Sequence, residues 1–141
     1  MITRRYREVL AIRLDEGDEV VSSLGRALAR HRITAGIITT FIGALRDCRL
    51  ILRKGHEERV ESHVEVVGNG NISLYEGKPF VHLHISAGNE RGVWVGHLMA
   101  GTVDIFCEAM VLPVNGKLVR KYDRSLAESG VTVPYILDLG R

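Results

Sequence analysis

The most informative stretch of this chain is residues 80–98, FVHLHISAGNERGVWVGHL, which predicts a β-hairpin. Strand-like runs flank the segment Gly88–Gly92, a Gly- and Asn-containing stretch of the kind that turns a hairpin. In an extended strand residues i and i+2 point to the same face, so His82 and His84 share a face with about 7 Å between them. Two such imidazoles can close on one ion.

The length of the turn decides where the third histidine, His97, lies. If residues 88–91 form a four-residue loop, His97 falls opposite His82. A two-residue loop at Glu90-Arg91 instead places His97 opposite His84. Every loop of even length keeps the three histidines on one face, whereas an odd loop or a bulge turns His97 away. The sequence leaves both even registers open.

Three neutral imidazoles with an open fourth position are typical of catalytic zinc sites, whereas structural zinc is usually enclosed by four protein ligands that often include thiolates. We therefore predict a metal site at His82, His84 and His97. Zinc ranks ahead of nickel, copper or iron, because nothing in the sequence indicates redox chemistry. The competing interpretation is that all three are ordinary polar strand residues. The remaining histidines are assigned to an exposed strand position, a helix end and a turn: His63, His31 and His56.

A fourth metal ligand could be water or a carboxylate. Glu108 is the leading acidic candidate, because its apolar strand directly follows the strand of His97, and Glu65 and Asp47 rank below it. The competing role of Glu108 is that of a solvated strand residue. Arg46, beside Asp47, could bind an anionic substrate with two hydrogen bonds, although a surface ion pair is the commoner role.

Short motifs, each weak alone, follow one another in a specific order: Gly17–Glu19, Gly43–Asp47, Gly70–Leu74, Gly77–His84, Gly96–Leu98 and Gly101–Val103. This ordered set resembles the PPC (plant and prokaryote conserved) domain, also called DUF296, over about residues 5–123. The resemblance implies a compact domain with a mostly antiparallel sheet, assembled as a homotrimer. In prokaryotic members it also implies a metal held by a His-x-His…His set, and all three of those positions are present here. A more distant similarity of fold, to acetolactate decarboxylase, points to the same kind of zinc site.

Two classes of function follow. The first is a metal-site protein that acts as a lyase or hydrolase on a small molecule, in which the ion acidifies a water or polarises a carbonyl. The second is a DNA-binding or regulatory module without catalysis. Plant relatives of the PPC domain carry an Arg-Gly-Arg-Pro element that enters the minor groove, but no proline of this chain follows such a run. The formal net charge is +2 and the basic residues are interleaved with acids, so DNA binding is expected to be weak or non-specific.

Length and composition predict one domain. The 141 residues, 45% hydrophobic, can bury a core without help from a metal or a disulfide. Cys48 and Cys107 lie among apolar residues and are expected to be reduced thiols, which indicates a reducing compartment. The sequence contains no signal-peptide pattern and no apolar run long enough to span a bilayer. We expect a cytoplasmic protein with no membrane contact.

The expected fold class is α+β, a mostly antiparallel sheet with one or two packed helices, divided into a core at about residues 5–123 and a tail at about 115–141. Asp18 is the expected N-cap of a helix that ends near His31. The tail segment Val131–Leu137 could return as an edge strand or dock on a neighbouring subunit. The other expected strands are Tyr6–Leu14, Ala35–Leu45 continued by Cys48–Arg53, Arg59–Val67, Asn71–Leu74, Lys78–Ala87, Gly92–Leu98 and Val103–Val114.

Overall fold

The predicted hairpin is present in the computed structural model, which describes residues 1–139. It consists of strands β6 (Lys78–Asn89) and β7 (Gly92–Pro113). Asn89 pairs with Gly92, so the turn is the two-residue alternative at Glu90-Arg91. The backbone N–H of Arg91 donates to Oδ1 of Asn89 at 2.8 Å, and this bond closes the turn. In the resulting register His84 pairs directly with His97.

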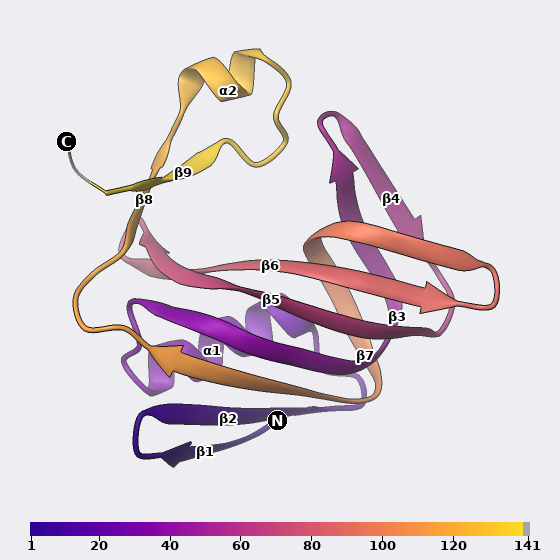
Figure 1. The fold of residues 1–141 in the computed structure, drawn as a ribbon, viewed down its shortest axis with the longest axis horizontal. Coiled ribbons are helices and arrows are strands. Elements are labelled where there is room, and N and C mark those ends of the chain that lie inside the picture. Colours follow the sequence, from indigo (N-terminus) through magenta and orange to yellow (C-terminus); the bar gives the residue numbers. More distant parts are fainter. Residues whose placement is uncertain (140–141) are drawn as a thin grey trace.

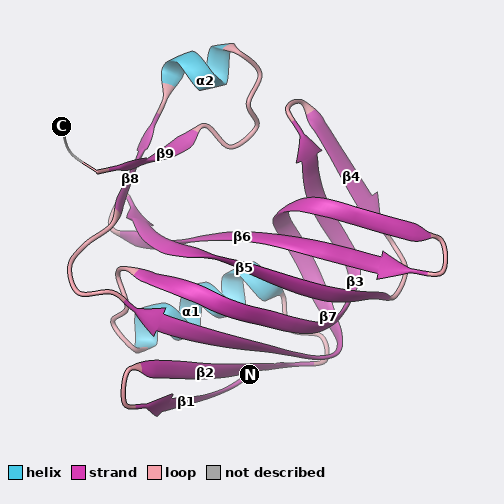
Figure 2. Cartoon of the chain, viewed as in Figure 1, coloured by secondary structure: helices cyan, strands magenta, loops and turns pink. Residues whose placement is uncertain are grey.

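Nine strands form one sheet in the described part of the chain, with helix α1 packed on one face (Figures 1 and 2). The strand order is β1-β2-β7-β3-β5-β8-β9, while β4 pairs with β3 and β6 pairs with both β5 and β7. All of these pairings are antiparallel except a short parallel contact between β5 and β8. The predicted α+β class is therefore confirmed. The remaining elements are β1 (Ile2–Tyr6), β2 (Val9–Asp15), α1 (Val20–Arg30), β3 (Gly36–Arg53), β4 (His56–Val60), β5 (Val64–Tyr75), β8 (Val119–Tyr122), α2 (Arg124–Glu128) and β9 (Tyr135–Asp138).

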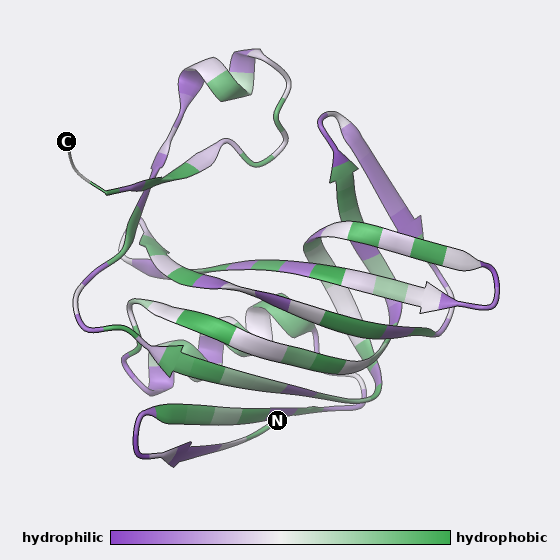
Figure 3. Cartoon of the chain, in the orientation of Figure 1, coloured by the Kyte–Doolittle hydropathy of each residue, from purple (hydrophilic) through white to green (hydrophobic). Residues whose placement is uncertain are grey.

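Helix α1 determines which face of β6 becomes the hydrophobic core. Its residues at three- and four-residue spacing, among them Leu24 and Leu28, are buried against the sheet. Because side chains alternate along a strand, Leu83 and Ile85 of β6 enter the same core. His82 and His84 consequently lie on the opposite face. Figure 3 shows the alternation of apolar and polar residues along the central strands.

The start of α1 differs from the prediction by one residue. Glu19, and not Asp18, is the N-cap: its carboxylate accepts hydrogen bonds from the backbone N–H groups of Val21 and Ser22. Asp18 instead accepts from the backbone N–H of Asp15 at 3.0 Å and so closes the turn after β2. The two neighbouring acids thus divide the turn and the cap between them.

Strand β5 runs without a break through residues 68–70, where the sequence predicts a turn. The glycines there permit a close approach of β6. A Cβ atom at Gly70 would collide with the carbonyl oxygen of His82, and one at Gly68 would collide with the carbonyl oxygen of His84. These two glycines therefore allow β6, the strand of His82 and His84, to pack closely against β5. In the sequence the same glycines are typical of a turn.

Three other strand boundaries were predicted incorrectly. The strand expected at Tyr6–Leu14 begins only at Val9, as β2; Tyr6 ends the separate strand β1, and a turn at Arg7-Glu8, with Arg7 at a φ of 48°, joins the two. The strand expected at Arg59–Val67 is divided at residues 61–63 between β4 and β5. The last two strands expected before the tail are one continuous strand, β7, which bends with its partner β3.

Residues 119–138, which we call the C-terminal arm, comprise β8, α2 and β9 and project from one end of the sheet (Figure 1). Strand β9 pairs with β8, so the segment predicted at Val131–Leu137 forms an edge strand over part of its length. The position of helix α2 was not predicted; its N-cap is Asp123. Residues 140–141 of the predicted tail lie outside the described residues. Neither helix found in residues 1–139 is long and apolar enough to cross a membrane.

Candidate metal centre

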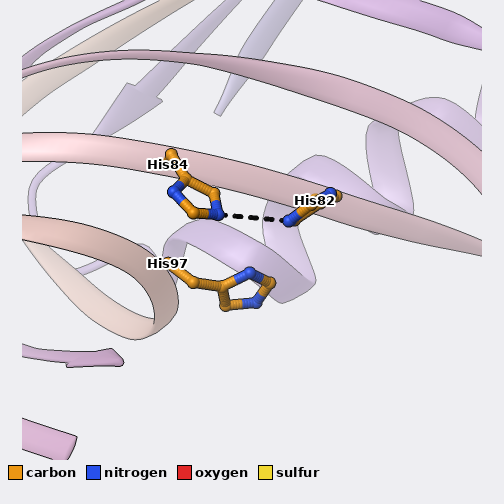
Figure 4. Close-up of side chains that lie close together, drawn as sticks. All are labelled: His82, His84 and His97. Carbon is orange, nitrogen blue, oxygen red and sulfur yellow. Dashed lines mark hydrogen bonds between the residues drawn. The ribbon is translucent and has the colours of Figure 1, made fainter. Parts of the chain in front are cut away.

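The three histidines of the hairpin converge on one face of the sheet (Figure 4). His82 and His84 come from β6 and His97 comes from β7. One ring nitrogen from each lies within 4.8 Å of the others. The ring centroids are 4.9 Å apart for His82 and His97, 5.0 Å for His82 and His84, and 5.4 Å for His84 and His97. The structure thus brings together the residues that the sequence singled out.

Access to the cluster is graded from the interior to solvent. His97 is 9% exposed, His82 is half-buried and His84 is exposed. On the side of His84 lies a shallow hollow bordered by Val67 and Val95. An ion or a small molecule could therefore approach past His84 and reach the two more deeply placed rings.

Burial keeps two of the three imidazoles neutral. The pKa of His97 is lowered to about 4, first by burial and then by the nearby His84 and Arg120. The pKa of His82 is likewise lowered to about 4, first by burial and then by Arg120, His97 and His84. Both rings are therefore neutral at physiological pH, the charge state that metal ligation requires. The donor set, three imidazoles without a charged ligand, fits zinc.

A buried arginine of the C-terminal arm contacts the cluster. Arg120 is 7% exposed, and its Nη2 lies 2.9 Å from Nδ1 of His82 and donates to Oδ1 of Asn71, also at 2.9 Å. Nε donates to Oγ of Ser73 at 3.0 Å, and Nη1 donates to the carbonyl oxygen of Tyr135 at 2.7 Å. In the sequence Arg120 is one of the basic residues that are interleaved with acids. No local pattern distinguishes it, because the contact arises only when β8 lies beside β5.

The acidic residues proposed as a fourth ligand are not part of the cluster. Glu108 lies far along β7 from His97, opposite Arg13 of β2, and borders a hollow next to β1. Asp47 forms an ion pair with Arg59 at 2.7 Å. Because β7 continues as one strand from His97 to Glu108, it places Glu108 far from His97.

Arg46 and His63 belong to a separate, exposed group of charges. Arg46 forms ion pairs with Glu16 at 3.3 Å and with Asp104 at 3.1 Å, as expected for a surface residue. Nδ1 of His63 lies 2.6 Å from Asp104, and Nε2 lies 3.2 Å from Glu65, the third acidic candidate. These hydrogen bonds, that of Asp104 first, raise the pKa of His63.

The last two histidines and both cysteines also lie outside the cluster. His31 is the C-cap of α1 and its Nε2 is 3.0 Å from Oγ1 of Thr3. His56 is the first residue of β4, and its Nε2 lies 3.4 Å from Oε2 of Glu58. Cys48 and Cys107 are buried free thiols, as expected, and burial raises the pKa of the Cys107 thiol to about 12. A protonated, buried thiol is a poor nucleophile, so cysteine chemistry has no support here.

An apolar pocket of about 420 Å³ adjoins His97. Its volume falls in the range of about 300–1,000 Å³ that is usual for small-molecule sites. Its walls come from α1, the start of β6, the strand of His97 and the C-terminal arm: Val21, Pro79, Phe80, Val81, Leu98, Met99, Thr132, Val133 and Tyr135. A small molecule could therefore place an apolar body beside the imidazoles.

The Plants and Prokaryotes Conserved (PCC) domain family model matches residues 1–115. A plant- and prokaryote-conserved protein of Pyrococcus horikoshii is similar in structure, with 28% sequence identity, 87% of this chain and 88% of that chain covered, and a TM-score of 0.74. A metal-containing protein of Archaeoglobus fulgidus is also similar, with 27% identity, 93% of this chain and 96% of that chain covered, and a TM-score of 0.76. A provisionally described DNA-binding protein of Bacteroides thetaiotaomicron shares the fold at 22% identity, with 99% and 98% covered and a TM-score of 0.86. No curated protein sequence matched the chain.

Proposed function

We propose, from the premise that this chain belongs to the Plants and Prokaryotes Conserved domain family, that it binds one divalent metal ion, zinc, through His82, His84 and His97 and uses it on a small molecule. The observation that carries the proposal is the convergence of three imidazoles, of which the buried His97 and the half-buried His82 have a pKa lowered to about 4. The similar protein of Archaeoglobus fulgidus, described as metal-containing, supports it. Within one chain a water molecule would complete the coordination, because no carboxylate among residues 1–139 joins the cluster.

The surroundings of the cluster favour a small molecule with an apolar body and an oxygen-bearing head group. Bound zinc would supply a Lewis acid that polarises a carbonyl or acidifies a water, which suits a lyase or hydrolase reaction. The apolar pocket beside His97 is the place for the apolar body. The exposed position of His84 leaves the head group a path from solvent.

Calorimetric titration of zinc into metal-free protein tests the site. We expect the wild type to bind one equivalent, and His84→Ala and His97→Ala to lose at least 100-fold in affinity while remaining folded, since the core does not depend on the ion. His63→Ala is the matched control, because it removes an exposed histidine from a different charge group. A folded wild type that binds no zinc, or a His97→Ala variant with unchanged affinity, would overturn the proposal.

We also propose that the protein assembles as a homotrimer, as the family resemblance implies. Ile42, Val67 and Val95 lie in one row across β3, β5, β6 and β7, interrupted by Ser86, and are exposed in the single chain. Because this row borders the hollow beside His84, subunit contacts would lie next to the metal site. Light scattering should report three times the 15.7 kDa of the chain, and Val67→Glu should shift the protein toward monomer. A wild type that stays monomeric at micromolar concentration would contradict the assembly.

The alternative is a DNA-binding or regulatory module. The structurally similar protein of Bacteroides thetaiotaomicron is less than 25% identical, so its description contributes the fold alone. Many basic residues on the surface of this chain are already in ion pairs with acids, including Arg13, Arg49, Arg59 and Arg124. Weak, non-specific DNA binding is therefore the form of this alternative that the charge distribution supports.

A further inference from the structure

We infer that Arg120 is a positioning residue that holds His82 in one tautomer and opposes metal loading, an inference that rests on the proposed metal site. A guanidinium has only N–H donors and no acceptor. Its Nη2 lies 2.9 Å from Nδ1 of His82, so Nδ1 must be the accepting nitrogen of that ring. Arg120 therefore selects the tautomer of His82 before any ion arrives.

Because Nδ1 of His82 accepts a hydrogen bond, the protonation of the other ring nitrogen, Nε2, is also determined. A neutral imidazole carries one N–H and one acceptor, so Nε2 of His82 carries the hydrogen. That Nε2 lies 3.2 Å from Nε2 of His84, which can accept it (Figure 4). Without an ion the cluster is thus a directed chain in which Arg120 donates to His82 and His82 donates to His84.

Metal ligation by His82 breaks this chain whichever nitrogen is used. Ligation through Nε2 requires the hydrogen to move to Nδ1, where two donors, Nδ1–H and the guanidinium, would then face each other. Ligation through Nδ1 takes the lone pair that accepts from Arg120. A metal-bound histidine ordinarily donates its other N–H to a carboxylate, carbonyl or water, and Arg120 presents the opposite polarity. Loading of the ion therefore costs the hydrogen bond between Arg120 and His82.

Arg120 is held in this position and is not free to bind a substrate anion. Four of its five N–H groups are engaged, one each by Ser73, Tyr135, Asn71 and His82, and the side chain is 7% exposed. The bond to the carbonyl oxygen of Tyr135 joins the guanidinium to β9. Arg120 also lies beyond residues 1–115, the part matched by the family model. The C-terminal arm thus adds a control on the histidine site that the matched region does not itself contain.

The tautomer of His82 can be read directly in the metal-free wild type from ¹⁵N-edited NMR spectra of its histidine side chains. We expect the Nε2–H form for His82, and in Arg120→Met a mixture of tautomers or the Nδ1–H form. An Nδ1–H tautomer in the wild type would overturn the inference. This measurement requires no ion, so a protein that fails to bind zinc but shows the Nε2–H form would refute the proposed function and leave only the selection of the His82 tautomer by Arg120 standing.

Zinc affinity provides the second measurement. Arg120→Met keeps an apolar stem but removes the donors, and we expect it to bind zinc about tenfold more tightly than the wild type. Lys121→Met is the control for loss of a positive charge, since Lys121 is the adjacent residue of β8 and is exposed; its affinity should change by less than about twofold. A change in Arg120→Met no larger than that in Lys121→Met would overturn the opposing role of Arg120. If Arg120→Met does not fold, the tautomer of the wild type still decides.

Discussion

Two histidine environments in this chain, the cluster around His97 and the exposed group around His63, shift the histidine pKa in opposite directions. Burial lowers the pKa of His97 to about 4. Hydrogen bonds that His63 donates to Asp104 and then to Glu65 raise its pKa. The difference shows that a histidine becomes a candidate metal ligand here through desolvation among other imidazoles, whereas carboxylate neighbours make it a cation in a surface ion-pair network.

The largest expected effect is on stability at acid pH, measured on the metal-free protein in the presence of a chelator. The folded pKa of His97 is about 4, whereas a histidine in the unfolded chain titrates near 6.5, so the unfolded state binds more protons between these values. The contribution of neutral His97 to the free energy of unfolding, roughly 3 kcal/mol, is fully present above pH 6.5 and is lost as the pH falls toward 4.

Urea unfolding at pH 7 and at pH 4.5 checks this, with His97→Gln as the comparison, because glutamine packs there without titrating. The wild type should lose more free energy of unfolding than the variant over that interval. Equal losses would mean that His97 is solvated in the folded protein, and the contrast with His63 would disappear.

A smaller effect is expected from Gly70→Ala, which tests whether the histidine cluster depends on the close approach of β5 and β6. The added Cβ would collide with the carbonyl oxygen of His82, so we expect a loss of about 1–3 kcal/mol and weaker zinc binding. Gly25→Ala is the matched control: its Cβ meets nothing within 4 Å, and it lies inside α1. There alanine should stabilise by about 0.5–1 kcal/mol. Thermal unfolding separates the two, and a neutral Gly70→Ala would contradict the register.

The substitution His63→Gln should change the free energy of unfolding by less than about 1 kcal/mol, because exposed ion pairs contribute little. The sign follows from the raised pKa: the stabilisation is fully present below the unfolded pKa of about 6.5 and is lost as the pH rises through the folded value. The variant should therefore differ from the wild type at pH 6 and match it at pH 9. A difference that persists at pH 9 would show that His63 acts through packing.

The weakest expected signal is the binding of duplex DNA. Binding through exposed Lys and Arg releases counterions, so the affinity should fall steeply between about 50 and 200 mM salt. Fluorescence anisotropy with A·T-rich and mixed duplexes should show no preference. Tight binding that distinguishes the two at physiological salt would favour the alternative function over the metal site.

Much of the fold could be predicted because its signals are local. Alternation along residues 80–87 and the Gly- and Asn-rich turn predict the hairpin, and the four-residue spacing of Val20, Leu24 and Leu28 predicts α1. Predictions failed where a glycine had a long-range role. Gly68 and Gly70 are typical turn residues by composition, and only the position of β6 explains why they lie inside a strand.

For the candidate site, the sequence by itself determined that His82 and His84 share a face and that His97 joins them in any hairpin of even turn length, because strand alternation is a property of the local backbone. Only the tertiary structure decided which even register forms, how deeply each ring is buried, that Glu108 lies elsewhere and that Arg120 donates to His82. Those outcomes depend on the order of strands in the sheet, which sets β8 beside β5 and joins residues that no local spacing connects.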